Sequence, residues 1–242
     1  MMSGPMTGGQ SGMHAESEEP APPRSDAQPA APIRQRLRIT FARGENARYV
    51  GHLDMARACE RILRRADLPV AYSEGFNPRP RLTFAAALPV GCTSDQEVLD
   101  VILSQPRDLA DVRARLDRAV PLGVHVVAVE EAPYSAPALP TQTRATEFVV
   151  TLPAEVSIDD AQARVQVLLA AASIERTRRD KTYDLRPLIV DLWVESGEDG
   201  RARIGMKLRA EESATGRPDE VVAALGWDAA SVRSQRRRII FA

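Results

Sequence analysis

The sequence predicts an α+β fold in which one order of elements (strand, helix, strands, helix, strand) occurs twice. Three observations lead to this prediction. Short segments alternate apolar and polar residues, which is typical of half-buried strands. Longer segments carry apolar residues at helical spacing, and each series holds two of them. A segment rich in Pro, Ala and Thr, residues 132–143, separates the two series and is typical of a linker.

The order of elements in each series is that of the split βαβ unit, the ferredoxin-like arrangement. We therefore expect tandem ferredoxin-like domains with antiparallel sheets, at residues 34–131 and 144–242. The two halves share a pattern and not a sequence, so the pattern alone suggests a duplication. Residues 1–33 contain almost no large apolar side chains, so we expect a disordered N-terminal tail there.

The first domain is predicted to begin with a strand at 36–43, where apolar residues occupy alternate positions. Residues 52–68 contain neither glycine nor proline and are predicted to form a helix that ends before Pro69. The apolar face of this helix is formed by Met55, Cys59, Ile62 and Ala66. The remaining elements are strands at 69–75, 81–91, 97–104 and 124–132 and an amphipathic helix at 107–120.

In the second domain, a helix is predicted at 157–172, where Ser157 is a suitable N-cap. A shorter helix is predicted at 217–227, because Pro218 is compatible with the first helical turn. The apolar and β-branched segments around them are predicted strands, at 146–153, 173–179, 187–196, 201–210 and 233–242.

Composition excludes several classes of protein. The 242 residues carry a net charge of -1, so there is no overall basic signature for nucleic acid. The two cysteines, Cys59 and Cys92, are expected to be reduced and are too few to hold an iron–sulfur cluster. We expect no metal or cofactor, because metal-spaced Cys/His clusters, glycine-rich phosphate loops and a nucleophile elbow are absent. Without a long apolar run or a secretory signal pattern, we expect a cytoplasmic chain with no membrane partner.

The segment YSEGFNPRPRL, residues 72–82, is the clearest candidate for a binding site. Glycine and two prolines restrict this loop, so its side chains lose little entropy on binding. An exposed aromatic ring beside guanidinium groups suits stacked bases and phosphates. The alternative is a stiff hairpin in which Phe76 packs inward and the arginines are only solvated. The candidate nucleic-acid-binding residues in the loop are Phe76, Asn77, Arg79 and Arg81.

The predicted helix at 52–68 carries an arginine stripe opposite its apolar face. Such a stripe can bind a phosphate backbone or an acidic protein surface. The alternative is a solvated face that Glu60 and Asp67 partly neutralise. Runs of basic residues at 176–181 and 236–238 modestly favour a polyanion partner. The stripe consists of Arg57, Arg61, Arg64 and Arg65, of which the first three are assigned as candidates for nucleic-acid binding.

Four residues are candidates for catalysis or substrate binding. His52 and Asp54 stand at the start of the first helix, and Asp184 and Arg186 lie in KTYDLRPLI before a strand. A histidine can act as an acid or base, but this one has no evident partner in sequence, and a lone histidine is more often structural. The second pair is equally explained by an Asp184–Arg186 ion pair. The four residues form a site only if the fold brings them together.

Several motifs, GHLD, YSEGFNPRPRL, ALPVG and the later E-x-LD, resemble a radical-SAM-linked, uncharacterised bacterial protein family. The resemblance covers residues 37–129, and KTYDLRPLI is similar to the family's second-half signature. Members stand beside a radical SAM gene or are fused to such an enzyme, which implies that this chain works with a separate radical SAM partner. The fold order also resembles that of certain pseudouridine synthases, but their GRTD-type motif is absent.

We therefore expect a non-catalytic partner of a radical SAM enzyme that binds RNA or presents a substrate in RNA modification. A second hypothesis is an enzyme that acts on a small anionic substrate in the cleft between the domains. A third is a protein–protein adaptor whose arginine stripe docks an acidic partner.

Overall fold

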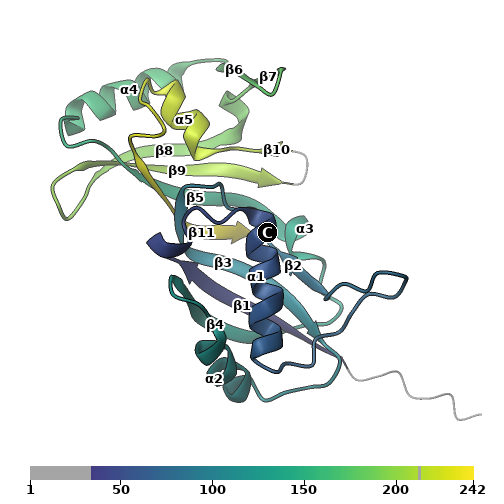
Figure 1. The fold of residues 1–242 in the computed structure, drawn as a ribbon. Coiled ribbons are helices and arrows are strands. Elements are labelled where there is room, and N and C mark those ends of the chain that lie inside the picture. The colour runs from purple at the N-terminus through teal and green to yellow at the C-terminus, as the bar shows by residue number, and fades with distance from the viewer. Residues whose placement is uncertain (1–33, 212–213) are drawn as a thin grey trace, which may run out of the picture. The chain divides into compact units, whose positions relative to one another are not determined.

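More residues lie in strands than in helices in the computed structural model of the protein, which describes residues 34–211 and 214–242. Within these residues, nine strands form one mixed, mostly antiparallel sheet with the order β10-β9-β5-β11-β3-β1-β4 (Figure 1). In addition, β2 pairs with β3, β8 pairs with β9, and β6 and β7 form a separate hairpin. The tail at 1–33, for which we expect disorder, lies outside the described residues. The strands are β1 (Gln35–Arg43), β2 (Leu82–Phe84), β3 (Cys92–Leu103), β4 (Val124–Ala132), β5 (Thr143–Thr151), β6 (Glu175–Arg178), β7 (Lys181–Asp184), β8 (Ile189–Ser196), β9 (Ala202–Glu211), β10 (Ala214–Thr215) and β11 (Arg233–Phe241).

The first half of the described chain has the strand order β4-β1-β3-β2, with every pair antiparallel. Two helices, α1 (His52–Arg65) and α2 (Leu109–Ala119), lie beside these strands (Figure 1). The apolar face predicted for the first helix is confirmed, because all four of its members are buried. They pack with the buried faces of β1 and β3 and of α2 in two adjoining core clusters.

The second half has the strand order β8-β9-β5-β11, again antiparallel throughout. Helices α4 (Ile158–Ala170) and α5 (Pro218–Ala224) lie beside β8 and β9 (Figure 1). The predicted cap is confirmed: the Ser157 hydroxyl accepts a hydrogen bond of 3.1 Å from the backbone N–H of Asp160. Pro218 is the first residue of α5, as expected. None of the helices described at 34–211 and 214–242 is long and apolar enough to cross a membrane.

The two halves are joined into one sheet by β11 and β3. Their pairing is parallel and covers three residues, Ser234 to Arg236 opposite Cys92 to Ser94. The segment expected to be a linker, 132–143, contains the end of β4, the short helix α3 (Leu139–Gln142) and the first residue of β5. The proposed division into two domains therefore stays a prediction, and the two sets of strands share backbone hydrogen bonds.

Two predicted strands differ from the structure. Residues 69–75 make only isolated bridges at Val70 and Tyr72, and the strand expected at 81–91 ends at Phe84. After Phe84 the chain leaves β3, and the carbonyl groups of Ala86 and Ala87 accept hydrogen bonds from the guanidinium of Arg236. The alternating pattern of residues 82–88 could not reveal this, because Arg236 lies about 150 residues later.

Candidate functional site

Residues Ser73–Arg79 form a finger that projects between α1 and β2 (Figure 1). Its base is closed by two hydrogen bonds: the Ser73 N–H donates to the Arg79 carbonyl (2.8 Å), and the Arg79 N–H donates to the Ser73 hydroxyl oxygen (3.0 Å). Gly75, with a φ of 120°, adopts a backbone conformation that other residues resist. The finger is thus a short, closed loop with restricted backbone freedom.

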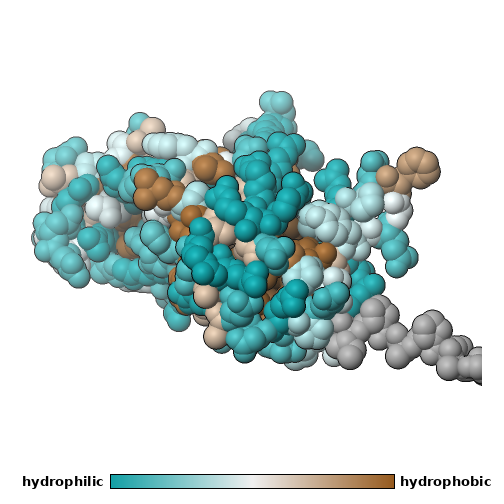
Figure 2. Space-filling model, turned by 60° about the horizontal axis from the view of Figure 1, so that its bottom comes forward, coloured by the Kyte–Doolittle hydropathy of each residue, from teal (hydrophilic) through white to brown (hydrophobic). Residues whose placement is uncertain are grey.

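Phe76 is fully exposed at the end of the finger, so the alternative in which it packs inward is wrong. Figure 2 shows a hydrophobic side chain at the tip of the narrow projection, on a face that is otherwise mostly hydrophilic. Asn77, Arg79 and Arg81 are exposed as well. Glu74 is the acidic residue of the finger, and it is also exposed. The tip therefore has one exposed aromatic ring beside exposed polar groups.

The arginine stripe of α1 is exposed at all four positions. Arg57 pairs with Asp54 at 3.3 Å, but both side chains are about two-thirds exposed, so the pair contributes little stability. Arg64 borders a groove of about 280 Å³ whose other wall is the base of the finger, at Tyr72 and Pro80. Glu60 and Asp67 border the same groove. The groove thus connects the stripe to the finger.

Tyr134 is a surface aromatic residue that the sequence prediction missed, because it lies in the segment assigned as a linker. It shares a second groove with Arg81, next to β2. Its hydroxyl accepts a long hydrogen bond (3.5 Å) from Arg34, and this bond, with Arg81 nearby, lowers the pKa of Tyr134. The sequence signal that could have identified this residue is a single tyrosine in a proline-rich segment. Exposed aromatic rings and arginines therefore lie on both sides of the finger.

The basic run at 236–238 is not a free cationic surface. Arg236 is buried and bonded to the Glu97 carboxylate at 2.8 Å, and Arg237 and Arg238 pair with Glu195 and Glu147. Three consecutive residues of β11 thus pair with acidic residues of three other strands, so this run does not support a polyanion partner. At 176–181, Arg176 pairs with Glu220 at 3.0 Å.

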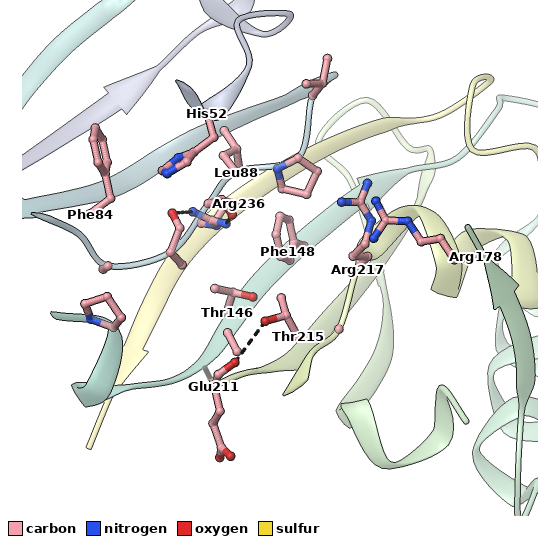
Figure 3. A pocket seen from close by; sticks show the side chains of 18 of the residues that line it. His52, Phe84, Leu88, Thr146, Phe148, Arg178, Glu211, Thr215, Arg217 and Arg236 are labelled. Atoms are coloured by element: carbon pink, nitrogen blue, oxygen red, sulfur yellow. Dashed lines mark hydrogen bonds between the residues drawn. The ribbon is translucent and has the colours of Figure 1, made fainter. Parts of the chain in front are cut away.

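A cavity of about 700 Å³ lies against β5 and β11 (Figure 3). Its walls come from both halves of the chain: the start of α1, the segment after β2, the hairpin β6–β7 and the segment between β9 and α5. Phe148, Leu88 and Arg236 belong to the buried core beneath it. The labelled lining residues are His52, Phe84, Leu88, Thr146, Phe148, Arg178, Glu211, Thr215, Arg217 and Arg236.

Among the described residues, four arginines line this cavity, compared with one acidic residue, Glu211. Arg236 is neutralised by Glu97, and Arg217 is held by Asp219 through two hydrogen bonds of 3.0 and 2.9 Å. In the view of Figure 3, the side chains of Arg178 and Arg217 both lie at one end of the cavity. His52 and Phe84 lie at the other end. The cavity is therefore cationic at one end and largely apolar at the other.

Of the four candidates for catalysis or substrate binding, only His52 lines the cavity. Asp54 is exposed on α1 beside Arg57. Asp184 accepts hydrogen bonds from the backbone N–H groups of Ile174 (2.8 Å) and Arg186 (2.9 Å), which lower its pKa. Arg186 bonds through its side chain to backbone carbonyl groups, so the expected Asp184–Arg186 ion pair does not form between the side chains. The structure does not bring the four residues together.

His52 packs edge-to-face against Phe84, with ring centroids 5.2 Å apart. Burial lowers the pKa of His52; Glu97 offsets this in part, and the guanidinium groups of Arg43 and Arg236 add to it. We therefore infer an uncharged imidazole at neutral pH, which can donate or accept a hydrogen bond in the cavity.

The two thiols are expected to be unreactive in the folded protein. Burial raises the pKa of Cys59 to about 12 and that of Cys92 to about 11, so the nucleophilic thiolate is scarce at neutral pH. Iodoacetamide should modify neither residue in the native protein and both after unfolding in urea, as counted by mass spectrometry. Rapid modification of the native protein would contradict this.

Within the described residues, no cluster of His, Cys, Asp and Glu could hold a metal ion.

Residues 36–218 match the model of a family described as "uncharacterized protein conserved in bacteria (DUF2344)". The chain belongs to this family. The match covers the finger, α1 and most residues that line the cavity, so both features lie within the part of the chain that defines the family. No curated protein matches the sequence at a significant level.

Three solved structures illustrate how distant the structural likenesses are. A chain of a Cbf5–Nop10–Gar1 complex is 10% identical, with a TM-score of 0.42 over 83% of this chain and 48% of that one. The chain thus spans about half the length of that relative. A putative glycine cleavage system transcriptional repressor is 13% identical (TM-score 0.24; 87% and 99% covered). Ferric DtpA from Streptomyces lividans is 12% identical (TM-score 0.22; 88% and 91% covered). Likenesses at these scores carry no conclusion about function.

Proposed function

We propose that the protein is a non-catalytic, cytoplasmic RNA-binding partner of a radical SAM enzyme in RNA modification, and that it holds RNA with the finger and the arginine stripe. The observation that carries this proposal is the full exposure of Phe76 at the tip of a closed, stiff loop. The ring adds nothing to the core there, and its place on a stiff loop beside exposed arginines supports a role in stacking on a ligand.

The neighbourhood of Phe76 suits single-stranded RNA. Aromatic rings stack on bases of any sequence, and guanidinium groups meet the phosphates between them. Arg79 and Arg81 lie on the finger and just beyond it, and Arg64 faces its base across the groove at Tyr72. We assign Arg57 and Arg61, further along the same helix, to phosphate contacts as well. RNA would thus lie along α1 and over the finger.

The proposal of a radical SAM partner rests on the sequence resemblance, which implies a separate enzyme beside this chain. We further propose that each half is a ferredoxin-like unit. The strand orders β4-β1-β3-β2 and β11-β5-β9-β8 support this, because each places the first strand of its half between the fourth and the third. A paired unit of this kind would present RNA from one half while the other half remains free to contact the enzyme.

Binding of total cellular RNA to the purified full chain tests this function. We expect retention that falls steeply as salt is raised. The double variant Phe76→Ala, Arg79→Ala should bind about tenfold to hundredfold more weakly, because it loses one stacked base and one phosphate contact. The slope of log affinity against log salt should become shallower by about 1.

The matched control is Tyr49→Ala, Arg209→Ala, which removes an exposed aromatic ring and an exposed arginine outside the finger. It should bind RNA as the unchanged protein does. Equal affinity of the finger variant and the control would contradict the proposal. Absence of RNA retention at low salt, together with co-purification of a radical SAM protein, would instead identify an adaptor.

A further inference from the structure

The cavity against β5 and β11 has properties that RNA binding by the finger does not require. Its volume of about 700 Å³ is within the range of small-molecule sites, which is roughly 300–1,000 Å³. Its walls come from six segments that are distant in the sequence, including the β6–β7 hairpin, which is not part of the main sheet. The cavity is thus a feature of the assembled fold of the described residues.

One end of the cavity gathers positive charge. Arg178 and Arg179 come from the β6–β7 hairpin, and Arg217 comes from the start of α5. Asp219 bonds to the Nε and one terminal nitrogen of Arg217. The other terminal nitrogen, Nη1, makes no hydrogen bond among the described residues. Guanidinium groups that line one end of a cavity can bind an oxyanion such as phosphate through paired hydrogen bonds, in a geometry that lysine cannot reproduce.

The rest of the cavity suits an uncharged body. Its floor is the ring of Phe148 with the neutralised guanidinium of Arg236 stacked 5.3 Å from the ring centroid. The far wall is formed by Phe84 and by His52, which we infer to be uncharged. A flat or apolar group fits between these surfaces, and the imidazole supplies one hydrogen bond at its edge.

We propose that this cavity binds a small phosphate monoester, with its phosphate between Arg178 and Arg217 and an uncharged, flat body over Phe148 toward His52. A phosphate monoester is favoured over a monocarboxylate because Arg178, Arg179 and the Nη1 edge of Arg217 can together donate more hydrogen bonds than one carboxylate accepts. The site is separate from the finger and does not depend on RNA binding. Cavity residues that have no role in the proposed RNA binding would thus bind a phosphate monoester.

Calorimetric titration of the full chain with phenyl phosphate and with AMP tests the proposal. Both probes should bind, and both should raise the melting temperature of the protein. Arg178→Gln should weaken binding about tenfold or more, because it removes one charge-assisted contact to the phosphate. Lys181→Gln, a cation on the same hairpin that does not line the cavity, is the matched control and should leave affinity unchanged.

Each further result has a defined meaning. If benzoate binds as tightly as phenyl phosphate, the assignment to phosphate is wrong. If inorganic phosphate binds as tightly as phenyl phosphate, the cavity does not hold an uncharged body. Failure of both probes to bind at millimolar concentration, or unchanged affinity in Arg178→Gln, would overturn the proposal. Arg217→Gln should weaken binding as Arg178→Gln does. If Arg217→Gln misfolds because it loses the pair with Asp219, the result with Arg178→Gln decides. The finger variant Phe76→Ala, Arg79→Ala should bind phenyl phosphate normally, so failure of either proposal is distinguishable from failure of the other.

Discussion

Replacing Glu97 with glutamine is expected to lower the free energy of unfolding by about 3–5 kcal/mol, because it leaves the buried guanidinium of Arg236 without its counter-ion. The two side chains are only 2% and 3% exposed, and Arg236 Nη1 contacts both carboxylate oxygens, at 2.8 and 3.1 Å. The pair lies beside the three-residue contact between β11 and β3. The loss would be a large share of the roughly 5–15 kcal/mol that stabilises a typical domain.

Urea denaturation measures this effect. The control is Asp117→Asn, which breaks a surface pair with Arg113 in α2 and should change stability by less than about 1 kcal/mol. A double variant, Glu97→Leu with Arg236→Met, should recover part of the loss, since an apolar pair carries no unpaired charge. A loss below about 1 kcal/mol in Glu97→Gln would show that water or another group neutralises Arg236.

Asp100→Ala is expected to have a similar effect, about 3–5 kcal/mol, because Asp100 is the buried partner of two arginines. Its carboxylate accepts hydrogen bonds from Arg36 and Arg38 of β1, both at 2.9 Å. Arg36 is itself buried, and it also donates to the carbonyl groups of Ala136 and Pro137. Removing Asp100 therefore leaves a buried cation and weakens the anchor of the segment that carries Tyr134.

Thermal and urea unfolding of Asp100→Ala should be compared with Asp160→Ala, whose partner Arg164 is partly exposed on α4. The control should lose less than about 1 kcal/mol. Hydrogen exchange adds a local test, because the backbone amides near Tyr134 should exchange faster in Asp100→Ala than in the control. Unchanged exchange together with unchanged stability would contradict the anchoring role of Asp100.

Local patterns predicted the helices well because helical spacing and capping are local properties. The apolar face of α1, the Ser157 cap and the position of Pro218 were all readable from neighbouring residues. The alternation in β1 indicated a half-buried strand, but Arg36 on its polar face is buried. Its burial depends on Asp100 and on residues about 100 positions later in the chain, which no local pattern contains.

The candidate functional residues also include some that the local sequence predicts and others that depend on distant parts of the chain. The finger could be predicted because its glycine, prolines, Phe76 and arginines are consecutive. The cavity could not, since its walls come from residues as far apart as His52 and Arg236. The basic run at 236–238 looked like a polyanion surface because its acidic partners, Glu97, Glu147 and Glu195, lie on other strands. Asp54 and Asp184 suggested chemistry, but the fold uses them in local contacts.

The position of β11 between β5 and β3 has a consequence for synthesis on the ribosome. Every other described strand is made before β11, which occupies residues 233–241. Until β11 emerges, β5 and part of β3 have open edges, and such edges can pair with other chains. The sheet of the nascent chain thus stays divided in two until β11 is made. Protection from aggregation begins when β11 pairs with β5 and β3.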